Sequence, residues 1–259
     1  MNQKHTNLDE ALTEGYHIEI GEVLDKSFNN YKKIVLIGAA AILITSIVIF
    51  AIYIAILGIV FGFTDFAKTI SGLQPQLMTG TAKIIMLSVM MVISGIFAPI
   101  KAGFINMAHN AENNLPFGLN NIFEFYSSTH FKDLFVTEAI VVFISSGISF
   151  CLQTIGYPGM SVFVSYTVML FLVFTSPLII YYDLKPFEAI AVSIKLVAKS
   201  PLKILLLLIV GFIFAFLGVF GLCIGIFFTV PFIISILYST FNEIAPIVKA
   251  DDLDEIGTL

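Results

Sequence analysis

Residues Ile204–Tyr238 read ILLLLIVGFIFAFLGVFGLCIGIFFTVPFIISILY and include no charged side chain. As a single helix this stretch would be roughly 50 Å long, at about 1.5 Å per residue, whereas the hydrocarbon core of a membrane is about 30 Å thick. The stretch is therefore too long for one crossing, and its glycines at 218, 221 and 225 mark the place where it can reverse. We expect two spans, at about 203–220 and about 222–241, joined by a tight turn.

Four further apolar runs precede this stretch, at residues 34–61, 84–100, 134–155 and 160–182. The whole chain of 259 residues is 58% hydrophobic and 12% charged, and its mean hydropathy is +0.97. A soluble domain is about 45–50% apolar and about 25% charged. The sequence therefore predicts an all-α, polytopic membrane protein with six transmembrane helices.

The charged residues exclude several classes of function. The net charge is −5, and all 13 basic residues are lysines. An acidic chain without arginine has neither the basic surface of a nucleic-acid-binding protein nor a bidentate phosphate clamp, so we expect no nucleic-acid partner. The sequence also contains no Ser/His/Asp arrangement, G-x-S-x-G motif or phosphate-binding loop. We expect no enzymatic activity and no cofactor.

The lysines indicate how the chain is oriented. Six spans place eleven lysines on one side of the membrane: Lys4, Lys26, Lys32, Lys33, Lys101, Lys132, Lys185, Lys195, Lys199, Lys203 and Lys249. Only Lys68 and Lys83 fall on the other side. Because positive charge concentrates on the cytoplasmic side, we expect both termini in the cytoplasm, with the protein in a bacterial inner membrane. Residues 1–17 then form a cytoplasmic tail, residues 18–243 the membrane domain, and residues 244–259 an acidic cytoplasmic tail.

A pattern recurs three times in the membrane domain, over residues 18–104, 116–182 and 185–243. Each unit starts with an amphipathic segment (Ile20–Tyr31, Phe117–Tyr126 or Pro186–Lys199), followed by a pair of spans. Leu24, Phe28 and Tyr31 match Leu119, Phe123 and Tyr126 at the same offsets, and Glu22, Ser27 and Lys33 match Glu188, Ser193 and Lys199. The sequence therefore predicts three repeats of an amphipathic helix plus a helical hairpin.

The second span of each pair includes one proline: Pro99, Pro177 or Pro231. Proline removes a backbone donor, which frees the carbonyls of Gly95, Val173 and Phe227 from their usual partners. One interpretation is that these are tolerated kinks in membrane helices. The other is that three kinked helices surround a pseudo-threefold axis along the membrane normal, with a binding site between the repeats.

The C-terminal half of the chain resembles a known family. The resemblance rests on Pro177, the "P-x-E-A" of Pro186–Ala189, Ser193, Lys199, the glycine hairpin, and the "T-x-P" of Thr229–Pro231; the opening segment IEIGEVLDKSFNNYKKI is also similar. The family is the six-span membrane domain attached to some bacterial glycerophosphoryl diester phosphodiesterases. In some relatives that domain continues into a catalytic barrel, whereas this sequence stops at Leu259. The resemblance therefore implies a membrane module and no active site.

Glu138 is the candidate functional residue within a span. An ionisable side chain there is a functional hypothesis by default, and Glu138 could be the coupling group of a carrier. Alternatively, it reaches the interface or pairs with a lysine, because it lies only about one turn inside its span. Ser145 and Ser149 extend a polar stripe along the same helix, together with Gln153. Such a stripe joins neighbouring helices more often than it lines a transport path.

The histidines and cysteines offer weaker candidates. His109 and Glu112 share one helical face, with His130 as a third potential metal ligand. A solvated surface explains these residues better than a metal site does. Cys151 and Cys223 fall near the outer ends of two spans, where either free thiols or a disulfide would fit.

Two functions remain. The first is a non-catalytic membrane module that binds lipid or another membrane protein. The second is a carrier of a small amphiphile through a cavity between the three proline-containing helices.

The orientation can be tested by labelling single introduced cysteines with a membrane-impermeant maleimide. We expect positions near Lys68–Lys83 to react from outside the cell, because this segment holds the only lysines outside the cytoplasm. Positions 195 and 252 should stay unlabelled until the membrane is opened. Labelling of position 252 from the periplasm would mean that the last apolar run crosses only once.

Overall fold

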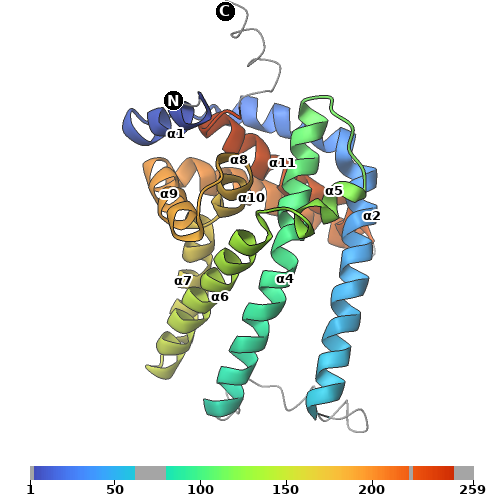
Figure 1. The fold of residues 1–259 in the computed structure, drawn as a ribbon, viewed down its shortest axis with the longest axis vertical. Helices are drawn as coiled ribbons and strands as arrows, with labels where there is room; N and C mark the ends of the chain where they lie inside the picture. The colour runs from blue at the N-terminus through green and yellow to red at the C-terminus, as the bar shows by residue number, and fades with distance from the viewer. Residues whose placement is uncertain (1–2, 62–79, 222–223, 248–259) are drawn as a thin grey trace, which may run out of the picture.

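The computed structural model describes residues 3–61, 80–221 and 224–247 of the chain, and these residues form helices joined by turns and short loops, without a strand. The helices are α1 (Gln3–Thr13), α2 (Ile20–Phe61), α4 (Gly80–Glu112), α5 (Asn120–Phe123), η1 (Glu124–Tyr126), α6 (Phe131–Thr154), α7 (Pro158–Phe171), α8 (Thr175–Tyr182), α9 (Pro186–Lys199), α10 (Pro201–Leu217), η2 (Gly218–Phe220) and α11 (Gly225–Ile244). Figure 1 shows α1, α8, α9 and α11 near one end of the molecule, with α2, α4 and the α6–α7 pair extending toward the other.

Six of these helices are long and apolar enough to cross a membrane, which confirms the predicted number. They cover Ile20–Ile52, Leu87–Glu112, Phe131–Thr154, Pro158–Tyr182, Pro201–Phe220 and Gly225–Ile244. Many of their large apolar side chains are exposed, including Leu36, Phe50 and Phe163. In water such exposure would be costly, but lipid tails are as apolar as these side chains. The six helices assign the chain to the integral membrane proteins.

The long apolar run of residues 204–238 reverses where its glycines lie, as predicted. Gly218 ends α10 and Gly225 begins α11, and the two residues pack backbone to backbone. A Cβ added to Gly225 would lie 2.5 Å from the carbonyl oxygen of Gly218, which is closer than real atoms approach. Only residues without a side chain permit this contact. Part of the connection, residues 222–223, lies outside the described residues.

The three prolines do not all interrupt their helices. Pro99 and Pro231 lie inside continuous helices, α4 and α11, and only the helix of Pro177 is broken, into α7 and α8. The break falls at residues 172–174, one turn before the proline, where its ring would meet the backbone of a regular helix. Membrane helices can continue past a proline, and α4 and α11 do so.

The three predicted amphipathic segments fold differently from one another. Residues 20–31 are continuous with the first span in α2, which in Figure 1 first lies across the end of the bundle and then turns to run along it. Residues 117–126 form only the short α5 and η1. Residues 186–199 form the separate helix α9, which Pro186 starts and Pro201 ends. The threefold organisation therefore stays a prediction.

The predicted N-terminal tail contains a helix. Leu8 and Ala11 of α1 are buried in the core, and the Tyr16 hydroxyl donates to the Leu196 carbonyl of α9 at 2.6 Å. Partial burial raises the pKa of Tyr16 to about 12, so its hydroxyl keeps its proton at neutral pH. Asn7 donates to the Pro246 carbonyl at 3.0 Å, so the first helix lies against the end of the last span.

The core lies where α4, α8, α9 and α11 meet, at the end of the bundle that holds α1 (Figure 1). Its fully buried side chains include Met107, Phe174, Leu178, Tyr238 and Phe241. Aromatic rings contact each other there, with Phe174 and Phe241 at a centroid distance of 5.6 Å. Side chains therefore fill the space where the second, fourth and sixth spans meet.

The glycine contact predicts a specific loss of stability. Gly225→Ala should lower the free energy of unfolding by about 1–3 kcal/mol, because its Cβ would overlap the backbone of Gly218. The measurement is reversible unfolding in mixed micelles, followed by circular dichroism. Gly147→Ala is the control, since a Cβ on Gly147 meets open space and alanine favours the helix by about 1 kcal/mol. Equal stability of the two variants would contradict the packing described.

Candidate functional site

Glu138, the predicted ionisable residue, pairs with a lysine of a neighbouring helix. Its carboxylate on α6 lies 3.6 Å from Lys101 Nζ on α4, and both side chains are partly exposed. A carboxylate alone in hydrocarbon would be costly, and the lysine compensates its charge. Of the two interpretations of Glu138, this geometry fits the ion pair.

Ser145 and Ser149 bond within and between helices. Ser145 donates to the Val141 carbonyl of its own helix at 2.7 Å. Ser149 and Ser165 lie 2.7 Å apart, so a hydroxyl–hydroxyl bond joins α6 to α7. Contacts of this kind hold membrane helices together.

Hydroxyl groups lie on the backbone beside each of the three buried prolines. Near Pro99, Tyr126 donates to the Ile96 carbonyl at 2.7 Å. Near Pro231, Thr229 Oγ1 is 3.0 Å from the Ala215 carbonyl of α10 and 3.1 Å from that of Gly225. The Ile96 and Gly225 carbonyls precede their prolines by one to two turns, and the Ala215 carbonyl belongs to the neighbouring helix α10. None of them is one of the three that the sequence singled out, Gly95, Val173 and Phe227.

Ser193 closes the break near Pro177. Its hydroxyl, fully buried on α9, donates to the Phe171 carbonyl at 2.8 Å and accepts from the Phe174 N–H at 3.2 Å. One side chain thus satisfies a backbone acceptor and a backbone donor on the two sides of the break between α7 and α8. Sequence analysis singled out Ser193 only as part of the repeat and of the family resemblance.

A polar network occupies the end of the bundle where α1 lies. His109 Nδ1 is 3.0 Å from the Tyr238 hydroxyl, which links α4 to α11, and Asn242 donates to Glu112 at 3.0 Å. His109 is therefore part of a half-buried network and not a solvated surface residue. His130 lies apart from this network, 3.5 Å from Asp183.

The described part of the chain holds no group of three or more His, Cys, Asp or Glu residues placed to bind a metal ion. Cys151 is exposed near the end of α6. Cys223 lies outside the described residues, as do Lys68 and the C-terminal tail from residue 248 onward, so the disulfide stays a prediction.

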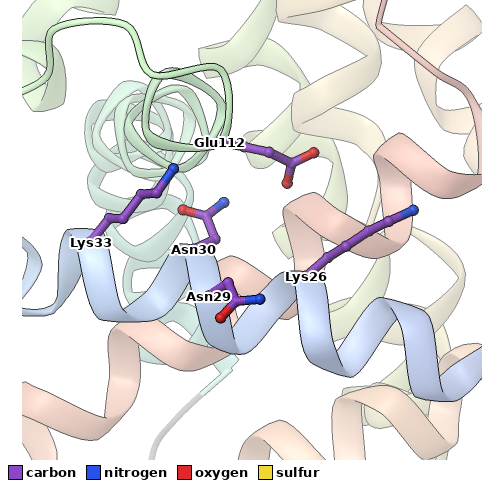
Figure 2. Close-up of a pocket in the computed structure, with 5 residues that line it drawn as sticks. All are labelled: Lys26, Asn29, Asn30, Lys33 and Glu112. Atoms are coloured by element: carbon purple, nitrogen blue, oxygen red, sulfur yellow. The ribbon is translucent and has the colours of Figure 1, made fainter.

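Beside the polar network, a pocket of about 250 Å³ opens between α2 and the end of α4. Its lining residues are Lys26, Asn29, Asn30, Lys33 and Glu112 (Figure 2). Four of them come from one face of α2, where positions 26, 30 and 33 recur at helical spacing. The polar spacing inside the segment KSFNNYKK is the sequence signal for this pocket, and the apolar residues of the same segment predicted only an amphipathic helix.

Side chains of α2 also donate hydrogen bonds to groups near the end of α4. Lys33 Nζ donates to the Ala111 carbonyl at 2.8 Å and to Asn114 Oδ1 at 2.9 Å, and Asn30 Nδ2 donates to the Ala108 carbonyl at 2.8 Å. The last carbonyls of a helix lack intrahelical donors and carry partial negative charge, so a lysine there is favourable. On the other side of the pocket, Lys26 Nζ pairs with Glu243 at 2.6 Å.

No protein-family model matches the chain, and neither a curated protein nor a solved structure matches it.

Ser193→Ala tests the closure of the α7–α8 break. It should lower the free energy of unfolding by about 1–2 kcal/mol, because the Phe171 carbonyl and the Phe174 N–H both lose their partner. The measurement is unfolding in mixed micelles. Ser27→Ala is a matched control: Ser27 is also fully buried but donates only to Val23 of its own helix, so we expect a smaller effect. Equal losses of stability in the two variants would show that the Ser193 contacts across the α7–α8 break add no stability.

Proposed function

We propose that this protein is a packed, non-catalytic module of a bacterial inner membrane, which binds lipid or a partner membrane protein at its cytoplasmic end. The observation that carries the proposal is the hydrogen bonding of the backbone near the three prolines. A protein hydroxyl, from Tyr126, Ser193 or Thr229, lies on the backbone beside each proline. A carrier would instead leave the backbone around the prolines open to a hydrated cavity between the repeats.

The packing between these helices supports the same proposal. Phe174 and Tyr238 are fully buried where the second, fourth and sixth spans meet, and Phe232 is nearly so. Thr175 and Ser176, which a carrier would expose to water, are buried in the core. The Glu138–Lys101 pair also gives Glu138 a structural role in place of a coupling role.

The orientation and the repeat belong to the proposal as well. Eleven of the thirteen lysines lie on the side assigned to the cytoplasm, and the Asn7–Pro246 bond is consistent with both termini being on that side. Ser27 and Ser193, which the repeat pairs with each other, are both fully buried. We retain the resemblance to the membrane domain of glycerophosphoryl diester phosphodiesterases as the family hypothesis.

Cysteine accessibility tests whether the interior is packed. In a background of Cys151→Ser and Cys223→Ser, Ser176→Cys should resist a small water-soluble maleimide in the folded protein, because Ser176 is only 3% exposed. Asp183→Cys, seven residues further on and largely exposed, should react at once. Both should react after unfolding in detergent, and mass spectrometry reports the label.

Rapid labelling of Ser176→Cys in the folded protein would mean that water reaches the proline helices. The carrier would then be the better interpretation. It would gain further support if the reconstituted protein conducted protons and Glu138→Gln abolished the flux.

A further inference from the structure

We propose that the pocket between α2 and the end of α4 binds the headgroup of a phospholipid with a phosphodiester and a primary ammonium, as in phosphatidylethanolamine. The inference names the ligand class of the lipid-binding role proposed above and rests on that role. Figure 2 shows the Lys26, Asn30, Lys33 and Glu112 side chains between the two helices. The pocket therefore presents both signs of charge to a ligand.

Lys33 supplies the positive side. Its two hydrogen bonds go to neutral oxygen atoms, those of Ala111 and Asn114, so they do not neutralise its charge. An ammonium has three donors, which leaves one for a phosphate oxygen. Lys26 is two helical turns away on the same face of α2, about 10 Å along the axis, at the other end of the pocket. Basic pockets between membrane helices on the cytoplasmic side are typical sites for phospholipid headgroups.

Asn30 supplies an acceptor. The residue is only 2% exposed, and its Oδ1 atom has no hydrogen-bond partner in the described structure. Its orientation is determined by Nδ2, which donates to the Ala108 carbonyl at 2.8 Å; the flipped amide would place two oxygens against each other. A buried acceptor without a donor is costly. A ligand that brings a donor to Asn30 would remove that cost.

Glu112 favours an ammonium as that donor. Its carboxylate lines the pocket opposite α2, and its Oε1 atom accepts from Asn242. Glu112 thus brings a negative charge to the same pocket, and a negative charge attracts a cation more strongly than a hydroxyl group. The volume of about 250 Å³ has room for roughly eight water-sized groups, which suits a phosphate with a two-carbon amine.

The surroundings favour a lipid over a soluble phosphate. Leu36 follows Lys33 by one turn of α2 and is 72% exposed, and Leu115, just beyond α4, is also exposed. Both are apolar side chains next to a polar pocket at the end of a membrane span. A lipid would place its headgroup in the pocket and its acyl chains along such side chains.

Native mass spectrometry of the full-length protein, with dioleoyl phosphatidylethanolamine and dioleoyl phosphatidylcholine, tests the ammonium. The two lipids share the phosphodiester, but the choline nitrogen has no N–H donor. We expect the ethanolamine lipid to bind about ten-fold more tightly, since its N–H groups reach Asn30 and Glu112. Equal binding of the two lipids would overturn the inference, and so would tighter binding of dioleoyl phosphatidylglycerol.

Lysine variants test the location. Lys33→Gln should weaken binding of the ethanolamine lipid about five-fold. Lys32→Gln is the matched control: it removes the same charge from the same turn, but Lys32 lies over the Phe28 ring, away from the pocket. Equal losses of affinity in the two variants would mean that only the general surface charge matters, and they would overturn the proposed binding site. If Lys33→Gln unfolds because α4 loses its cap, Lys26→Gln serves instead, since it leaves Glu243 to repel the phosphate.

The source of the phosphate is tested separately. Soluble O-phosphoethanolamine and inorganic phosphate should not displace the lipid at equal concentration, and displacement by either would overturn the lipid assignment. Failure of this inference and failure of the packed module give different results. If Ser176→Cys is protected from the maleimide but the protein binds none of these lipids, only this inference is overturned. If Ser176→Cys is labelled rapidly and the protein still binds the ethanolamine lipid, only the packed module is overturned.

Discussion

Backbone polar groups in hydrocarbon must find partners inside the protein, and this constraint explains much of the structure. A helix meets it by itself except at its ends and at prolines. Here side chains from elsewhere in the chain satisfy some of these groups: Ser193 at the α7–α8 break and Lys33 at the end of α4. These polar contacts join neighbouring helices, as does the close packing of Gly218 on Gly225.

The two ends of the molecule therefore differ in the kind of residue contacts that they contain. At the end that holds α1, aromatic rings and polar networks tie α4, α8, α9 and α11 together, and His109, Tyr238 and Asn242 belong to that region. Toward the other end, to which α2, α4 and α6 extend in Figure 1, many large apolar side chains of these helices are exposed. A lipid-facing surface tolerates variation in such side chains, whereas the packed end depends on particular residues.

Local sequence was sufficient to predict the six spans and the reversal near Gly218 and Gly225, which follow from apolar run length and from the geometry of glycine. It also predicted a break at each of the three prolines, but only the helix of Pro177 is broken. It was not sufficient for features that depend on partners distant in the chain. The packing of α1 on α9, the pairing of Glu138 with Lys101, and the side of α2 that faces α4 all arise from contacts between separate helices. Continuity of α2 was also missed, because its amphipathic start and its apolar continuation differ in pattern but not in backbone conformation.

The packing of α2 against α11 has a consequence for the time at which the protein folds. Gly38 lies against the Pro231 ring, and Lys26 pairs with Glu243, so the first span of the chain has the last one as a partner. Synthesis proceeds at about 5–20 residues per second, and roughly 190 residues separate these elements. The first span therefore waits in the membrane for tens of seconds before its partner exists. During that interval α2 has its contacts with α4, but Lys26 is without Glu243 and Gly38 is without the Pro231 ring, and a chain cut short before residue 225 would never gain these two contacts.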